Sequence, residues 1–130
     1  MRTAARVFFV VLAVVLVAVG ALAIRMTVMG RRLAAGHTTV ASVDLTQLPD
    51  GRYTGSFGDF LVSAEVEVEV QAGRITGARI VSQECGPGYE AAETIDRILA
   101  AQSPLVDVVS GATGSSRSIM VAAHRALTGQ

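Results

Sequence analysis

The amino-acid sequence predicts an α+β domain, with a mainly antiparallel sheet and two packed helices, preceded by one N-terminal transmembrane helix. Three observations support this class. The eighteen residues Val7 to Ile24 contain no charged side chain. Between Val62 and Val70, apolar side chains occupy every second position, as in a strand with one buried face. Later in the chain, apolar side chains recur at helical spacing in two segments. Strands followed by helices are typical of an α+β domain.

Composition allows one small domain beside the apolar segment. The chain has 130 residues, of which 51% are hydrophobic and 17% charged. A helix of eighteen residues is about 27 Å long, close to the hydrocarbon thickness of about 30 Å. From Asp44 onward eleven acids face six arginines, so the remainder is net acidic and has no basic stripe. Nucleic acid is therefore not an expected partner.

The N-terminus can be interpreted as an anchor or as a signal peptide. Arg2 and Arg6 form a positive start, and Ala21 to Ala23 has the small-x-small pattern of a cleavage site. The apolar run is longer than the usual signal-peptide core, and Arg25 follows it at once. We therefore favour an uncleaved anchor over residues 1–29, with the membrane helix at about 7–24. Flanking arginines are nearly balanced, so charge leaves its orientation open.

Residues 30–47 are polar and small, which predicts a linker ahead of a domain at 48–130. A turn at Leu48 to Gly51 opens this domain, and Arg52 to Phe57 is expected to form the first strand. Tyr53 and Phe57 could stack on a planar ligand, but core packing is the favoured use.

The clearest strand spans Val62 to Val70, with three glutamates between its apolar side chains. A row of like charges on one strand face is usually solvated, and nothing nearby completes a set of metal ligands. Ala72-Gly73 predicts a hairpin turn into a strand over Ile75 to Ser82. The single cysteine, Cys85, excludes a disulfide framework or a cysteine-cluster metal site.

Two helices and one short strand complete the expected fold. A Gly- and Pro-containing loop leads into a helix from about Tyr89 to Gln102, which Pro104 ends. The apolar segment Leu105 to Val109 predicts a short strand. A second helix follows, with Ser115 or Ser116 as its N-cap and Gly129 at its C-terminal end, as expected from capping preferences.

The segment from Asp107 to Ser116 is the part of the sequence that indicates a functional site. A buried segment ends there in a loop of small residues that opens into a helix. Backbone N–H groups at a helix start favour a phosphate, and Gly111, Ala112 and Gly114 leave room for a bulky group. Thr113 offers a hydroxyl at the most accessible point. By itself the pattern is weak, since most Gly- and Ser-rich helix starts only cap a helix.

The same segment resembles the attachment motif of the FMN-binding domain family, which includes flavin-carrying subunits of the sodium-pumping NADH:quinone reductase and of the Rnf complex. That motif is an Asp, two free positions, Ser or Thr, then Gly-Ala-Thr. It is matched here by Asp107, Ser110, Gly111, Ala112 and Thr113 without a mismatch. The resemblance extends over roughly residues 48–127.

The resemblance implies a cofactor and a site. In the family a flavin transferase joins the FMN phosphate to the last threonine of the motif as a phosphoester, so Thr113 is the expected acceptor. Asp107 with Ser110 to Ala112 would form the signal that the transferase reads. The expected flavin-binding residues are Thr113, Asp107, Ser110, Gly111, Ala112, Gly114, Ser115, Ser116, Glu84, Gly86 and Gly88. The last three lie in a loop where many members have Glu-Thr-Pro-Gly.

The resemblance also implies an electron carrier rather than an enzyme, in a single-pass cell-membrane protein whose C-terminal domain is extracytoplasmic. Its redox donor and acceptor, protein or quinone, stay unidentified. The main alternative is a membrane-anchored interaction module of the same fold without covalent flavin, in which residues 110–116 only cap a helix. A flavin-dependent reductase ranks lowest, because no proton donor is evident near the motif.

Overall fold

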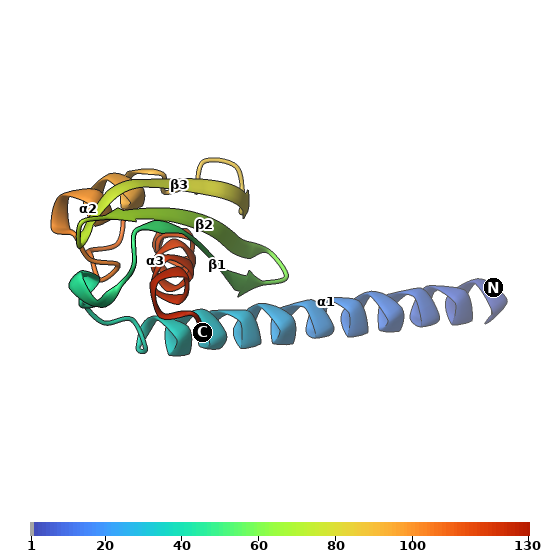
Figure 1. Cartoon of the computed structure of the whole chain (residues 1–130). Helices are drawn as coiled ribbons and strands as arrows, with labels where there is room; N and C mark the ends of the chain where they lie inside the picture. Colours follow the sequence, from blue (N-terminus) through green and yellow to red (C-terminus); the bar gives the residue numbers. More distant parts are fainter. Residues whose placement is uncertain (1) are drawn as a thin grey trace. The chain divides into compact units, whose positions relative to one another are not determined.

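The computed structural model describes residues 2–130 and divides into two compact units, the second of which is Arg32–Gln130. Helix α1 (Arg2–His37) makes up the described part of the first unit and enters the second (Figure 1). The predicted anchor includes Met1, which lies outside the described residues. The stretch Thr3–His37 is long and apolar enough to cross a membrane, a property that signal sequences share. It is therefore a candidate single-pass anchor.

Helix α1 continues into the segment that was predicted as a linker, because it ends only at His37. Arginine, leucine and alanine follow Gly30, and all three favour helices. Tertiary contacts add to this preference: Leu33 is buried, and Gly36 lies directly against the Phe57 ring. Extended chain and the short 3₁₀ helix η1 (Leu45–Gln47) then lead to the sheet.

The sheet has three antiparallel strands in the order β1 (Gly51–Asp59), β2 (Val62–Gln71) and β3 (Arg74–Glu84). All three were predicted with slightly shorter bounds, β2 from its alternating apolar and polar side chains and β1 and β3 from the turns beside them. The hairpin turn after β2 is also confirmed: Ala72 and Gly73 have φ values of 49° and 70°, as the tight turns of hairpins require.

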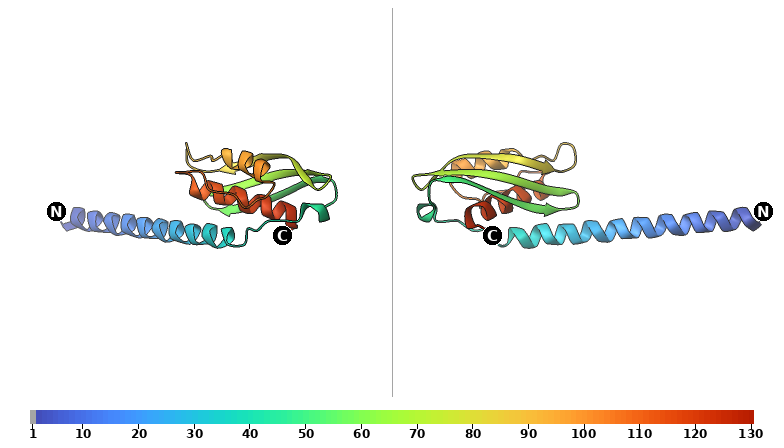
Figure 2. Two further views of the ribbon diagram at one scale, coloured as in Figure 1. Left: turned by 90° about the vertical axis from the view of Figure 1, so that its left-hand side faces the viewer. Right: turned by 45° about the vertical axis from the view of Figure 1, so that its right-hand side comes forward.

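Helices α2 (Glu93–Ala101) and α3 (Thr113–Thr128) cover one face of this sheet. Helix α3 packs on β1 and β2, and α2 packs on β3 (Figure 2). The core between them contains the inward-facing valines of β2 and the apolar side of both helices. Tyr53 and Phe57 pack against this core, as expected from their place on β1. The predicted α+β class is confirmed.

The opposite face of the sheet carries the glutamates of β2. Glu67 accepts a hydrogen bond from Arg79 Nε at 2.9 Å, and this bond, opposed in part by desolvation, holds the pKa of Glu67 below its usual value. Glu69 lies 3.9 Å from Arg52. Among the described residues no cluster of three potential metal ligands occurs. Glu67 and Glu69 therefore pair with arginines on the outer face of the sheet, the face on which the alternation placed the three glutamates.

Two elements differ from the sequence-based expectation. Helix α2 starts at Glu93 rather than near Tyr89, because Ala91 has a φ of +53° and interrupts any helix before it. The segment Leu105–Val109 is extended but joins no strand of the sheet, so the predicted fourth strand is wrong. Two of its carbonyl groups accept hydrogen bonds from a side chain of α2 instead.

Candidate functional site

A tight turn joins the extended segment to α3. The Val109 carbonyl accepts a hydrogen bond from the Ala112 N–H at 3.0 Å, which closes a four-residue turn. Gly111 is its third residue and has a φ of +79°, the value that a type II turn requires and that glycine adopts without strain. The Gly-Ala pair of the motif thus reverses the chain just before the helix.

Ser116 ties this turn to the first helical turn. Its Oγ accepts the Val109 N–H at 2.9 Å and donates to the Ala112 carbonyl at 2.8 Å. The side chain is fully buried, and Ser115 beside it is 3% exposed. The prediction that one of these serines is the N-cap of the helix is wrong, because α3 has already begun at Thr113. Ser116 instead fixes the shape of the loop.

The start of α3 has no capping side chain. Its N-cap residue is Ala112, which has no oxygen to offer to the free N–H groups of the first turn. Alanine is among the least favoured N-caps, since those N–H groups then depend on water or a ligand. Thr113 is the first helical residue and is exposed. A hydroxyl and a set of uncapped N–H groups therefore meet at one accessible point.

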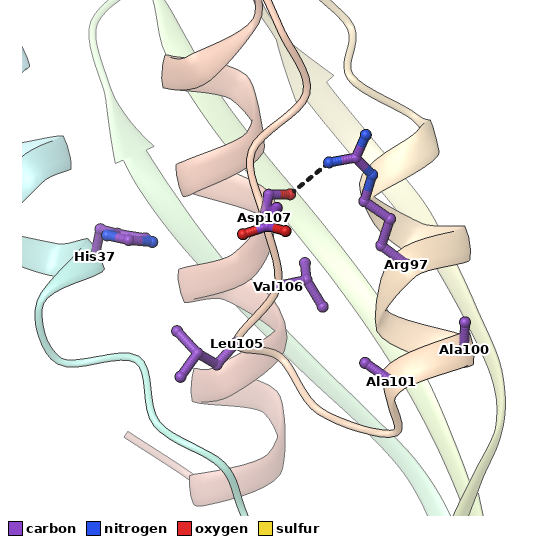
Figure 3. A pocket seen from close by; sticks show the side chains of 7 residues that line it. All are labelled: His37, Arg97, Ala100, Ala101, Leu105, Val106 and Asp107. Atoms are coloured by element: carbon purple, nitrogen blue, oxygen red, sulfur yellow. Dashed lines mark hydrogen bonds between the residues drawn. The ribbon is translucent and has the colours of Figure 1, made fainter.

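Arg97 of α2 holds the extended segment in place. Its Nη1 donates to the carbonyls of Asp107 at 3.0 Å and Val108 at 2.9 Å (Figure 3 draws the first). The same guanidinium is oriented by Glu93, which accepts from its Nε and Nη2. Sequence patterns do not indicate this role, because it joins residues ten and eleven positions apart without a local pattern.

Replacing Arg97 with methionine should loosen the loop before α3. The Asp107 and Val108 carbonyls lose their donor, so we expect a loss of roughly 1–3 kcal/mol in the free energy of unfolding. Amide hydrogen exchange should become faster at Val109, whose N–H is held by Ser116. Arg79→Met is the control, since its ion pair lies on the exposed face and its loss should change the free energy of unfolding much less. Equal effects of the two changes would contradict the role of Arg97.

A groove of about 920 Å³ lies beside the same segment. It is lined by the end of α2, by Leu105 to Asp107 and by His37, and Figure 3 shows these side chains around it. Asp107 borders the groove, but Thr113 is not among its lining residues. The groove is therefore lined by Asp107, the first residue of the motif, and not by Thr113.

The predicted loop after β3 lies at the same end of the sheet as Thr113. Glu84 ends β3 and pairs with Ser63, next to Val62. A Cβ placed on Gly114 would lie 3.9 Å from Val62 Cγ1, so the start of α3 reaches this end too. Within the loop, Gly88 has a φ of +83° and its N–H donates to the Glu90 carboxylate at 3.1 Å.

The predicted site residues thus divide into two groups. An exposed group can meet a ligand: Asp107, Ser110, Gly111, Thr113, Glu84, Gly86 and Gly88, with Gly114 partly exposed. Ala112, Ser115 and Ser116 are buried. The Ser116 hydroxyl is already engaged within the chain. These buried residues shape the loop from inside.

The exposed group fits an FMN phosphate. An uncapped helix start supplies N–H groups with a partial positive charge, which suits a phosphate. No atom lies within 4 Å of a Cβ position built on Gly111 or Gly88, so open space borders both glycines. A Gly-rich end of a small α+β domain with this helix start is the kind of site that accepts a phosphate.

Comparison with known proteins gives the family. The family model described as FMN-binding domain matches residues 62–128, just over half of the chain. The match includes strands β2 and β3 and both packed helices, and it begins after β1. The chain belongs to the FMN-binding domain family, and FMN is its cofactor. No match is found among curated proteins.

Proposed function

We propose that this chain is a membrane-anchored flavoprotein that carries FMN covalently on Thr113 and relays electrons in an extracytoplasmic redox chain. The observation that carries the proposal is the exposed Thr113 hydroxyl at the uncapped start of α3, within a complete attachment motif. Family membership supports FMN as the group attached there.

Attachment forms a bond between Thr113 Oγ1 and the flavin phosphorus. Esterification by free FMN in water is unfavourable, so the donor is an activated flavin nucleotide containing a phosphoanhydride. That anhydride bond breaks, a nucleoside monophosphate leaves, and the hydroxyl proton passes to solvent. A separate flavin transferase carries out this step and reads Asp107 with Ser110 to Ala112. Asp107, at the edge of its groove, is accessible to such a partner.

The protein's part is to hold and orient the cofactor. When bound, FMN supplies one- and two-electron redox chemistry. The turn at Gly111 and the Ser116 hydrogen bonds fix the direction in which Thr113 projects. The exposed residues Glu84, Gly86 and Gly88 border the same end of the sheet and would line the flavin. The redox donor and acceptor are proteins or a quinone, and the chain itself is a carrier rather than an enzyme.

We infer an extracytoplasmic location because a covalent bond to the cofactor is most useful there. Outside the cytoplasm a dissociated FMN would be lost, so a phosphoester keeps the carrier loaded. A reporter fused after Gln130 tests this orientation. Alkaline phosphatase, which folds only outside the cytoplasm, should be active in the fusion, and a fluorescent protein that matures only inside should be the weaker reporter. The reverse result would place the domain in the cytoplasm.

Co-expression with a flavin transferase tests covalent attachment. The full-length chain should run on a denaturing gel as a fluorescent band, and its intact mass should rise by FMN less one water. The chain expressed without transferase is the control and should keep its unmodified mass. An unmodified mass in both samples would exclude the phosphoester. Flavin that is then lost on denaturation would indicate noncovalent binding, and no flavin at all would favour an interaction module of this fold.

A further inference from the structure

Two arginines of the chain are half-buried, whereas the other described arginine side chains are exposed. They are Arg97 on α2 and Arg117 on α3. The Arg97 guanidinium donates four hydrogen bonds, to Glu93 and to two carbonyl groups. The Arg117 side chain donates no hydrogen bond to any described residue, and its Nε is buried without a partner. Both side chains are thus half-buried, but only the Arg97 guanidinium has hydrogen-bond partners.

A buried Nε without a hydrogen-bond partner is a costly feature in a small domain. Burying a donor of a charged group without an acceptor costs more free energy than leaving it in water. Among the described residues no carboxylate forms an ion pair with Arg117. The missing acceptor is therefore expected to come from outside the chain, and it should carry negative charge.

The position of Arg117 indicates where that acceptor lies. Arg117 follows Thr113 by four residues on α3, so the two side chains share one face of the helix, with Cβ atoms about 6 Å apart. Helical side chains lean toward the N-terminus, which brings the guanidinium back over the first turn. The uncapped N–H groups lie at the same turn. Both features favour an anion beside Thr113.

We propose that Arg117 is the residue that binds the flavin phosphate at Thr113, which rests on the function proposed above. Its guanidinium donates charge-assisted hydrogen bonds to the phosphate oxygens, while the first N–H groups of α3 approach from the helix axis. Arg117 is a positioning residue: it fixes the point of attachment, and with it the direction in which the flavin ring leaves the helix.

Comparison of FMN with riboflavin tests this role without the covalent bond, because riboflavin lacks the phosphate. The full-length chain, produced without transferase and purified in detergent, is titrated with each flavin, and binding is followed by flavin fluorescence. The wild-type chain should bind FMN more tightly than riboflavin by roughly tenfold or more. Arg117→Met should remove this preference, and Arg117→Lys should keep part of it.

Arg74→Met is the matched control, since Arg74 is exposed and starts β3 at the opposite end of the sheet. It should keep the full preference for FMN. An Arg117→Met chain that still prefers FMN by the wild-type ratio would overturn the proposal, and so would a wild-type chain that binds FMN no more tightly than riboflavin. In either case the flavin phosphate is not the partner of Arg117.

Thermal unfolding separates phosphate binding from a merely structural role. Flavinylated wild-type chain should melt at a higher temperature than unflavinylated chain, and Arg117→Met should abolish this difference. An equal loss of stability in both forms would instead mean that Arg117 supports the fold alone. Failure of covalent attachment gives a distinct pattern: the wild-type mass stays unmodified with transferase present, while the preference for FMN over riboflavin still depends on Arg117.

Discussion

Replacing Thr113 with valine should abolish flavin attachment completely, from a fully modified to an unmodified chain, when the transferase is co-expressed. Valine keeps the shape of threonine but lacks the oxygen that forms the ester. The Thr113 side chain is exposed and makes no hydrogen bond to another described residue. The free energy of unfolding should therefore change by less than about 0.5 kcal/mol. Intact mass and thermal unfolding measure the two effects on the same sample.

Neighbouring hydroxyls provide the controls for this experiment. Ser116 is buried with its Oγ engaged, and Ser115 is nearly as buried, so neither can replace Thr113 as acceptor. Ser110 is exposed, and Ser110→Ala should lower modification only through recognition by the transferase. Thr113→Ser retains an oxygen at the same atom position and should stay partly modified. Flavin still attached to Thr113→Val would show that another hydroxyl is the acceptor.

The strands and the motif could be predicted from the sequence because each depends on a short pattern. Alternating valines fix the inner face of β2, and Ala72-Gly73 fixes its hairpin. The residues of the attachment motif likewise follow one another in the chain. The family match to residues 62–128 includes β2, its hairpin and this motif.

The local geometry of the site could not be predicted, because it depends on contacts between distant residues. By preference alone a serine should cap α3, but the Ser116 hydroxyl bonds to Val109 and Ala112 instead. The helix instead begins at Thr113, with Ala112 at an N-cap position that it cannot cap. An apolar run such as Leu105 to Val109 suits a strand, yet two of its carbonyls bond to Arg97. Both errors concern hydrogen bonds of the segment that leads into Thr113.

Replacing Gly55 with alanine should strongly destabilise the sheet. Gly55 lies on the inner face of β1, opposite Val66 of β2, where α3 crosses the strand. A Cβ at this position would overlap the backbone of α3, at the Ala122 carbonyl oxygen and the Ala126 nitrogen. Backbone of a buried helix cannot move aside as a flexible side chain can. We expect a loss of about 3 kcal/mol, the upper part of the range for overpacked cores.

That loss corresponds to a fall in the melting temperature of about 12–24 °C for a domain of this size. Gly77→Ala is the matched control, because a Cβ there would meet only the Glu69 side chain, at 3.6 Å. Its melting temperature should stay within a few degrees of wild type. A Gly55→Ala variant that still folds should have a displaced α3. Because α3 begins at Thr113, this variant should also be flavinylated less completely. Equal stability of the two alanine variants would show that α3 does not pack on β1 as closely as its contacts with Gly55 indicate.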